Sequence, residues 1–233
     1  MQVADATNSA PWEVTLSAED YKKLNVEEGA LLAKADNLVA LGKWPAAVVY
    51  YEQIHNDFRP GNLQEANYAR SRLLYYYTQV RSNVDQALAL ANELVKVPGY
   101  AKDTYLIRAG LYREKKMYIE AIGDYMLADQ PPGTFFAIAE CYVEWGKPSM
   151  AITQLSEIES FFAAEAPEAA LRIAYVWRDA HDQPRYIAAL RALINKYPKS
   201  TQAQTARQLL AGLGVDRNGP GVNERGGGKI SEK

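Results

Sequence analysis

The chain alternates apolar runs with short breaks, and this alternation favours helices joined by tight turns. The breaks hold proline, glycine or clustered polar residues, as in LGKWP (41–45), VPGY (97–100), QPPG (130–133) and WGKPS (145–149). Between them, apolar residues recur at helical spacing, and Tyr105, Ala109 and Tyr112 share one face. Ser17 with Asp20 has the pattern of a first helix start. We therefore predict an all-α protein with about a dozen helices up to about residue 213.

A pattern of five positions recurs along these helices. In its clearest copy, Ala109 is followed by a turn residue, Lys116, an aromatic residue, Tyr118, then Ala121 and Tyr125. The small-residue position of the first helix falls at 35, 75, 109, 139 and 174, which are 40, 34, 30 and 35 residues apart. The turn position falls at 42, 82, 116, 146 and 181. Copies one, three and four keep the pattern best, whereas copies two and five are looser. The chain is therefore predicted to be a repeat of helix pairs.

Close packing explains the residue types of this pattern. Alanines at 109 and 121 let two helices approach, and Tyr112 and Tyr125 fill the space beside them. One pair cannot bury its own apolar face, so the pairs must stack and the last one needs a polar-backed cap. Residues 200–214 suit such a cap helix, with Ser200 as its N-cap and Gly212 or Gly214 at its end.

The spacing and the alanine–aromatic pattern over residues 26–213 resemble the tetratricopeptide repeat family, whose unit is a helix pair of about 34 residues. The resemblance implies a right-handed superhelical solenoid of antiparallel helix pairs, with about five repeats and a C-terminal cap helix. We expect a flexible arm at 1–16, the repeat domain at 17–214 and a disordered Gly-rich tail at 215–233. Trp12 in the arm is expected either to dock on the repeat body or to belong to the partner site.

The last helix pair carries a narrower likeness. The segment ALINKYPKSTQAQTARQLLAGLG (192–214) is similar to the ending of bacterial cell-envelope tetratricopeptide proteins, of the outer-membrane assembly lipoprotein and Tol–Pal coordinator types. As written, the sequence lacks a secretory signal, which predicts a cytoplasmic protein. If a leader has been removed, the prediction becomes a periplasmic or envelope-attached protein.

Composition narrows the possible partners. The net charge is −2 and the sequence pI is about 5.8, which does not favour nucleic acid. No apolar run is long enough for a membrane span, and the lone Cys141 predicts no internal disulfide. We therefore expect a protein or peptide partner.

Catalytic residues are not evident in the sequence. Glu120 with Asp124 and Glu140 with Glu144 are carboxylate pairs at i, i+4, which suit acid–base chemistry, a hard cation or simply a solvated helix face. We expect outward-facing solvated pairs, and no enzyme activity, cofactor or metal. The alternative is an envelope-associated glycan-processing enzyme or accessory that uses the Glu140/Glu144 pair.

The resemblance implies that first helices line a concave groove in which a ligand binds. Mapping the inward positions of the family onto this chain gives the candidate groove residues, which are Arg72, Tyr76, Gln79, Leu106, Arg113, Phe136, Glu140, Arg172, Tyr175 and Arg178. Tyrosine, phenylalanine and arginine suit an extended peptide with acidic or amide groups. The positions that hold a terminal carboxylate in chaperone-binding members carry Leu32, Asp36, Arg72 and Tyr76 here, so a chaperone adaptor is not supported.

We therefore predict a non-catalytic scaffold that binds a partner protein or peptide in the groove. A second alternative is homo-oligomeric assembly, in which the groove of one copy takes a helix of the next.

Overall fold

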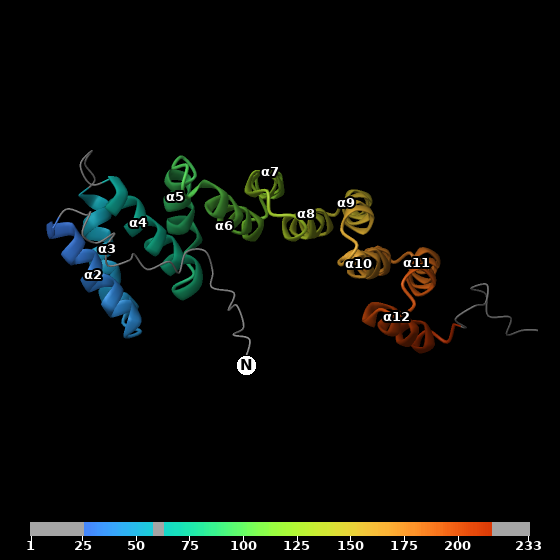
Figure 1. The fold of residues 1–233 in the computed structure, drawn as a ribbon. Coiled ribbons are helices and arrows are strands. Elements are labelled where there is room, and N and C mark those ends of the chain that lie inside the picture. The colour runs from blue at the N-terminus through green and yellow to red at the C-terminus, as the bar shows by residue number, and fades with distance from the viewer. Residues whose placement is uncertain (1–25, 58–62, 216–233) are drawn as a thin grey trace, which may run out of the picture. The chain divides into compact units, whose positions relative to one another are not determined.

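The computed structural model describes residues 26–57 and 63–215, and within these ranges the chain is helical with no strand. The predicted all-α fold is therefore confirmed (Figure 1). The predicted helix start at Ser17, the docking of Trp12, and the arm at 1–16 lie outside the described residues. The helices are α2 (Val26–Ala40), α3 (Trp44–Asn56), α4 (Leu63–Tyr75) with the π-helix η2 (Tyr76–Val80), α5 (Val84–Leu94), α6 (Ala101–Glu114), α7 (Tyr118–Ala128), α8 (Gly133–Glu144), α9 (Pro148–Phe161), α10 (Ala166–Asp179), α11 (Gln183–Lys196) and α12 (Thr201–Gly212).

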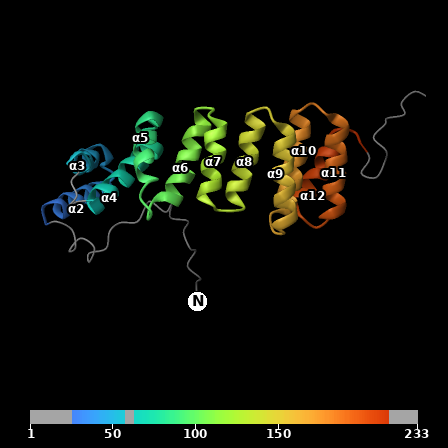
Figure 2. The same cartoon turned by 90° about the horizontal axis from the view of Figure 1, so that it is seen from above.

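The chain divides into two compact units, residues 1–129 and 130–233. In the first unit each helix from α2 to α7 packs against the next one, and α2 also contacts α4. In the second unit α8 to α12 do the same, and α10 also contacts α12 (Figure 2). Each unit is thus a stack of helix pairs, as in a helical repeat solenoid. The predicted extent of a single domain, 17–214, stays a prediction.

A three-residue loop joins the two helices of every pair, at 41–43, 81–83, 115–117, 145–147 and 180–182. The middle residue of each loop is left-handed, and these residues are Gly42, Ser82, Lys116, Gly146 and His181, with φ between 52° and 72°. They are the turn positions that the sequence pattern predicted. In four loops two backbone hydrogen bonds close the helix end, as when Met117 N–H bonds Tyr112 C=O at 2.9 Å and Lys116 N–H bonds Arg113 C=O at 2.9 Å. This is a Schellman motif, and it reverses the chain.

Lys116 adopts an unfavourable backbone conformation at this turn, because a residue with a side chain disfavours positive φ. We expect Lys116→Gly to raise the free energy of unfolding by about 0.5–1 kcal/mol, because relief of the strain exceeds the extra entropy of an unfolded glycine. Urea denaturation measures the change. Gly146→Ala is the reverse control: its new Cβ would meet no atom within 4 Å, so the backbone alone should lower stability by about 1 kcal/mol.

The alanine positions of the pattern are the centre of the core. Ala35, Ala109, Ala139 and Ala174 in first helices are at most 2% exposed, and Ala47, Ala87, Ala121 and Ala151 in second helices are fully buried. In copy five Tyr186 occupies the alanine position and is 4% exposed, so this copy keeps the buried position but enlarges the residue. Copy five therefore keeps the buried position with a larger residue, whereas in copy two the first-helix position holds Tyr75, which is only partly buried and stacks on Trp44.

Helix starts follow their local sequence. Pro45, Pro148, Pro167 and Pro184 each lie in the first turn of a helix, where a missing N–H costs nothing. The predicted cap helix is confirmed, because Ser200 Oγ accepts a hydrogen bond from Ala203 N–H at 3.0 Å at the start of α12. Val215 packs against the core cluster that holds Leu210, so the folded body includes this first residue of the predicted tail. The rest of the predicted tail lies outside the described residues.

Candidate functional site

In the second unit, polar side chains link α8 and α10, which are the first helices of their pairs, to the cap helix α12. Arg172 on α10 donates from Nη1 to Glu140 Oε1 on α8 at 2.7 Å and from Nε to Glu168 Oε1 at 2.8 Å. Gln202 on α12 donates to Glu168 Oε2 at 3.3 Å. The guanidinium also lies 4.6 Å from the centre of the Phe136 ring. We call Phe136, Glu140, Glu168, Arg172 and Gln202 the Arg172 cluster.

The Arg172 cluster is open to solvent, yet its central side chain is held in place. The side chains of Arg172, Glu140 and Glu168 are 35%, 42% and 38% exposed. Burial lowers the pKa of Arg172, but the hydrogen bonds that Arg172 donates to Glu168 and Glu140 outweigh burial and raise it. Two ion pairs and an aromatic stack therefore fix a permanently charged group on an accessible surface.

The repeat explains why these residues meet. Glu140 and Arg172 are 32 residues apart, and Glu168 and Gln202 are 34 residues apart. Each separation is about one repeat, so equivalent positions of successive first helices come to lie side by side. The sequence prediction included Phe136, Glu140 and Arg172 but missed Glu168 and Gln202. The signal was present, because Glu168 precedes Arg172 by four residues and the repeat period leads from Glu168 to Gln202.

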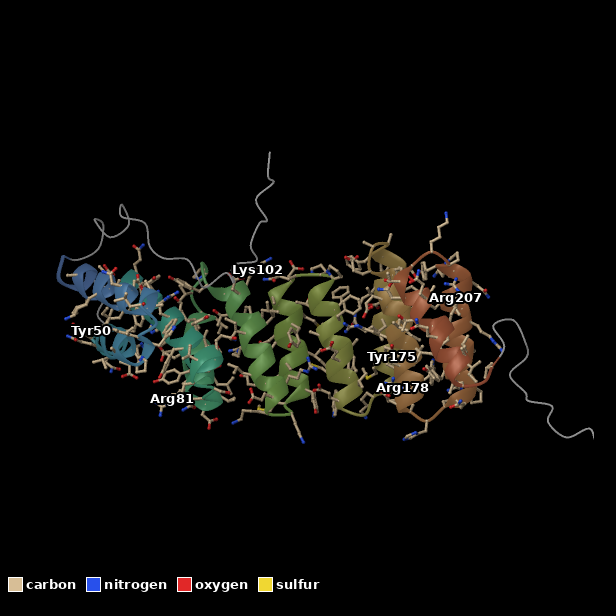
Figure 3. The ribbon with its side chains drawn as sticks, turned by 90° about the horizontal axis from the view of Figure 1, so that it is seen from below. Tyr50, Arg81, Lys102, Tyr175, Arg178 and Arg207 are labelled. Atoms are coloured by element: carbon tan, nitrogen blue, oxygen red, sulfur yellow. The ribbon has the colours of Figure 1, made fainter. Side chains whose placement is uncertain are left out.

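Tyr175 and Arg178 extend this surface along α10 (Figure 3). The Arg178 guanidinium lies 4.6 Å from the centre of the Tyr175 ring, and its Nε donates to Asp179 at 2.9 Å. Residues 168, 172 and 175 follow at i, i+4 and i+7, so they share one helix face. The predicted site residues of the second unit are thus brought onto one surface.

The same arrangement in the first unit is buried. Asp36 on α2 accepts hydrogen bonds from the hydroxyls of Tyr51 and Tyr68, and its Oδ1 lies 3.9 Å from Arg72 Nε on α4. Arg72 also lies over the Trp44 ring, at 5.4 Å. The side chains of Arg72 and Asp36 are only 5% and 9% exposed. Here an arginine and an acid on successive first helices form part of the core.

The other predicted groove residues of the first unit differ in exposure. Tyr76 is 6% exposed and packs against Trp44 and Tyr77. Gln79 is exposed in η2, whereas Leu106 and Arg113 are half-buried on one face of α6. Arg72 and Tyr76 are therefore buried and have little surface that a partner could contact.

The expectation that Asp124 faces solvent is wrong. Asp124 is 4% exposed. Arg108 donates a hydrogen bond to each of its oxygens, from Nε to Oδ2 at 2.6 Å and from Nη2 to Oδ1 at 2.8 Å. Arg108 also donates to Asn92 at 2.9 Å and lies 5.5 Å from the ring centres of Tyr105 and Tyr112. The ion pair therefore joins α5, α6 and α7 inside the first unit, whereas Glu120 is exposed as expected.

A further polar group surrounds the buried side chain of Arg70. Its Nε lies 3.0 Å from both His55 Nδ1 and Glu93 Oε2, and its Nη1 donates to Asn67 at 2.9 Å. His55 accepts this hydrogen bond through Nδ1, so the bond requires the neutral ring. Burial, followed by the charge of Arg70, lowers the pKa of His55 below its usual 6.5, although Glu93 and Glu52 oppose the shift.

This geometry predicts acid sensitivity. The unfolded chain takes up a proton at His55 near pH 6.5, whereas the folded chain resists it, so stability should fall as pH drops below about 6.5. Urea titrations between neutral pH and pH 5 measure the loss. His55→Asn, whose side-chain oxygen can accept from Arg70, should flatten this part of the profile. The same change at the exposed His181 should leave it intact, and a profile unaltered by His55→Asn would contradict the assignment.

Other functional groups give little indication of chemistry. Across 26–57 and 63–215, no three His, Cys, Asp or Glu side chains gather where they could hold a metal ion. Nor is any helix in those ranges long and apolar enough for a membrane crossing. Cys141 is buried, and Glu140 of the Glu140/Glu144 pair is engaged by Arg172.

Comparison with known proteins agrees with the geometry. The fold and the stacked first helices define a helical repeat protein. Residues 168–200, which cover most of α10 and all of α11, match the family model described as tetratricopeptide repeat. This match supports the tetratricopeptide resemblance of the sequence pattern over this helix pair. The match lies on copy five, one of the two that the pattern ranked as looser. No curated protein matches the chain. The narrower envelope likeness stays a prediction.

Proposed function

We propose that this protein is a non-catalytic interaction module that binds a partner protein or peptide on the first-helix surface of the second unit. The surface consists of the Arg172 cluster with Tyr175 and Arg178. Tetratricopeptide repeats are commonly protein-interaction modules, which supports this class of function. The glycan-processing and self-assembly alternatives have no comparable support among the described residues.

The observation that carries the proposal is the fixed yet exposed position of Arg172. Arginine and aromatic side chains dominate binding hot spots when their geometry is set before the partner arrives. Arg172 is held by two carboxylates and Phe136 while about a third of its side chain remains accessible. In contrast, Arg72 has a similar place in the first unit but no comparable exposure.

The test is the loss of partner binding on truncation of Arg172. We expect Arg172→Ala to weaken binding by about tenfold or more, as at a hot spot. The partner would be isolated from native cells with the tagged full-length chain, and its affinity measured by calorimetry.

Arg185→Ala is the matched control. Arg185 lies on α11, the second helix of its pair, and its guanidinium lies 4.6 Å from the centre of the Trp177 ring. The substitution therefore removes the same kind of cation–π contact, but from a residue outside the proposed surface. We expect its affinity to stay near that of the wild type. Equal binding by both variants and the wild type would place the partner elsewhere and contradict the proposal.

A further inference from the structure

The charge of the Arg172 cluster determines which partner it can accept. One guanidinium faces two carboxylates, Glu140 and Glu168, at 2.7 and 2.8 Å. The cluster therefore carries about one net negative charge. Gln202, its remaining polar member, is neutral and already donates to Glu168. An approaching segment therefore meets an arginine whose charge is already balanced by two acids.

We infer that the partner segment at this surface is rich in amide groups, and that Glu140 and Glu168 exclude acidic segments. The inference rests on the proposed function and names the chemistry of its ligand. The residue types of the groove predict a peptide with either acidic or amide groups, and the charge of the cluster favours only the amide groups.

An amide fits both kinds of polar atom that the cluster offers. The two ion pairs use Nε and Nη1 of Arg172, and a guanidinium has five N–H donors, so Nη2 can donate to an amide carbonyl. An ionised carboxylate accepts about four hydrogen bonds, so an amide N–H can donate to Glu168 beside the arginine. Gln202 shows that pairing within the chain, since its side-chain amide donates to Glu168. Asn or Gln side chains, or the main chain of an extended peptide, can supply both groups.

A carboxylate fits only half of this arrangement. It can accept from Nη2 of Arg172, but it has no donor for Glu168 and is repelled by both acids. Each of the two acids is more than a third exposed, so they face the approaching segment as well as the arginine. Removing their charges should therefore change the preference of the surface rather than its fold.

The experiment selects ligands from a random peptide library displayed on phage, with the full-length chain as bait. Peptides that depend on Arg172 are kept by counter-selection against Arg172→Ala, with Arg185→Ala as the control for non-specific loss. We expect the retained peptides to be enriched in Asn and Gln and poor in Asp and Glu.

A matched pair of synthetic peptides then measures the effect. Changing the Asn and Gln residues of a selected peptide to Asp and Glu should weaken its binding to the wild type by about tenfold. In the double variant Glu140→Gln and Glu168→Gln, with folding checked by circular dichroism, this difference should shrink or reverse.

The outcomes separate the two claims. Retained peptides that are acidic, or an acidic counterpart that binds the wild type equally well, would overturn the inference while the proposed function stands. If no peptide depends on Arg172, the proposed function and the inference both fail.

Discussion

Asp36→Ala should lower the free energy of unfolding by about 3–5 kcal/mol, because it leaves a buried arginine without its acid. Asp36 accepts from the hydroxyls of Tyr51 and Tyr68 and pairs with Arg72, which is 4% exposed. Burial and the neighbouring Asp36 raise the pKa of both tyrosines, so they stay protonated donors. The substitution therefore removes the acceptor of two hydroxyls and the negative charge that faces Arg72.

Urea denaturation measures the loss of stability, and the same substitution at the exposed Asp85 is the control. Asp85 forms an ion pair with Lys115 at 2.7 Å, but its side chain is 83% exposed. Asp85→Ala should change stability by less than about 1 kcal/mol, since exposed pairs contribute little. If the two variants lost similar amounts, burial would not be what makes Asp36 important.

The turns of this fold were predictable from sequence, because each depends on a few neighbouring residues. The five turn positions of the repeat pattern all adopt positive φ, although three of them are Ser82, Lys116 and His181 and not glycine. Helix length and the three-residue loop leave the chain only this way to reverse. A local pattern was enough even where the residue type was unfavourable.

The candidate site was only partly predictable, because burial depends on residues far away in sequence. Arg72 and Arg172 occupy similar positions on first helices, and each pairs with an acid on the preceding first helix. Around Arg72, Trp44, Tyr51 and Tyr68 close over the pair. Around Arg172, the smaller Phe136 and Gln202 leave the surface open. Large aromatic residues in neighbouring helices thus decide whether the same pair belongs to the core or to an accessible surface.

The burial of Asp124 follows from the helix face on which it lies. The four-residue spacing of Glu120 and Asp124 predicts one solvated pair. However, Asp124 lies three residues after the buried Ala121 and four before the buried Ala128, which places it on the core side of α7. Arg108 on α6 likewise lies four residues after the buried Thr104 and three before the buried Leu111. The helical face, rather than the spacing of the acids, therefore separates the structural acid from the solvated one.

Asp124→Asn should lower the free energy of unfolding by about 2–4 kcal/mol. The asparagine keeps the size of the side chain and one acceptor but removes the charge that faces Arg108. The expected loss is smaller than for Asp36→Ala because the Arg108 side chain is 16% exposed. Arg108 also keeps its hydrogen bond to Asn92 and its cation–π contacts with Tyr105 and Tyr112.

Glu120→Gln on the same helix is the control for this prediction, and it should change stability by less than about 0.5 kcal/mol because Glu120 is exposed. Hydrogen exchange adds a spatial check, since loss of the Arg108–Asp124 pair should speed exchange in α5, α6 and α7, the helices that it joins. Equal stability of the two variants would mean that packing of Ala121 and Tyr125 alone holds α7, and that the ion pair adds nothing to the first unit.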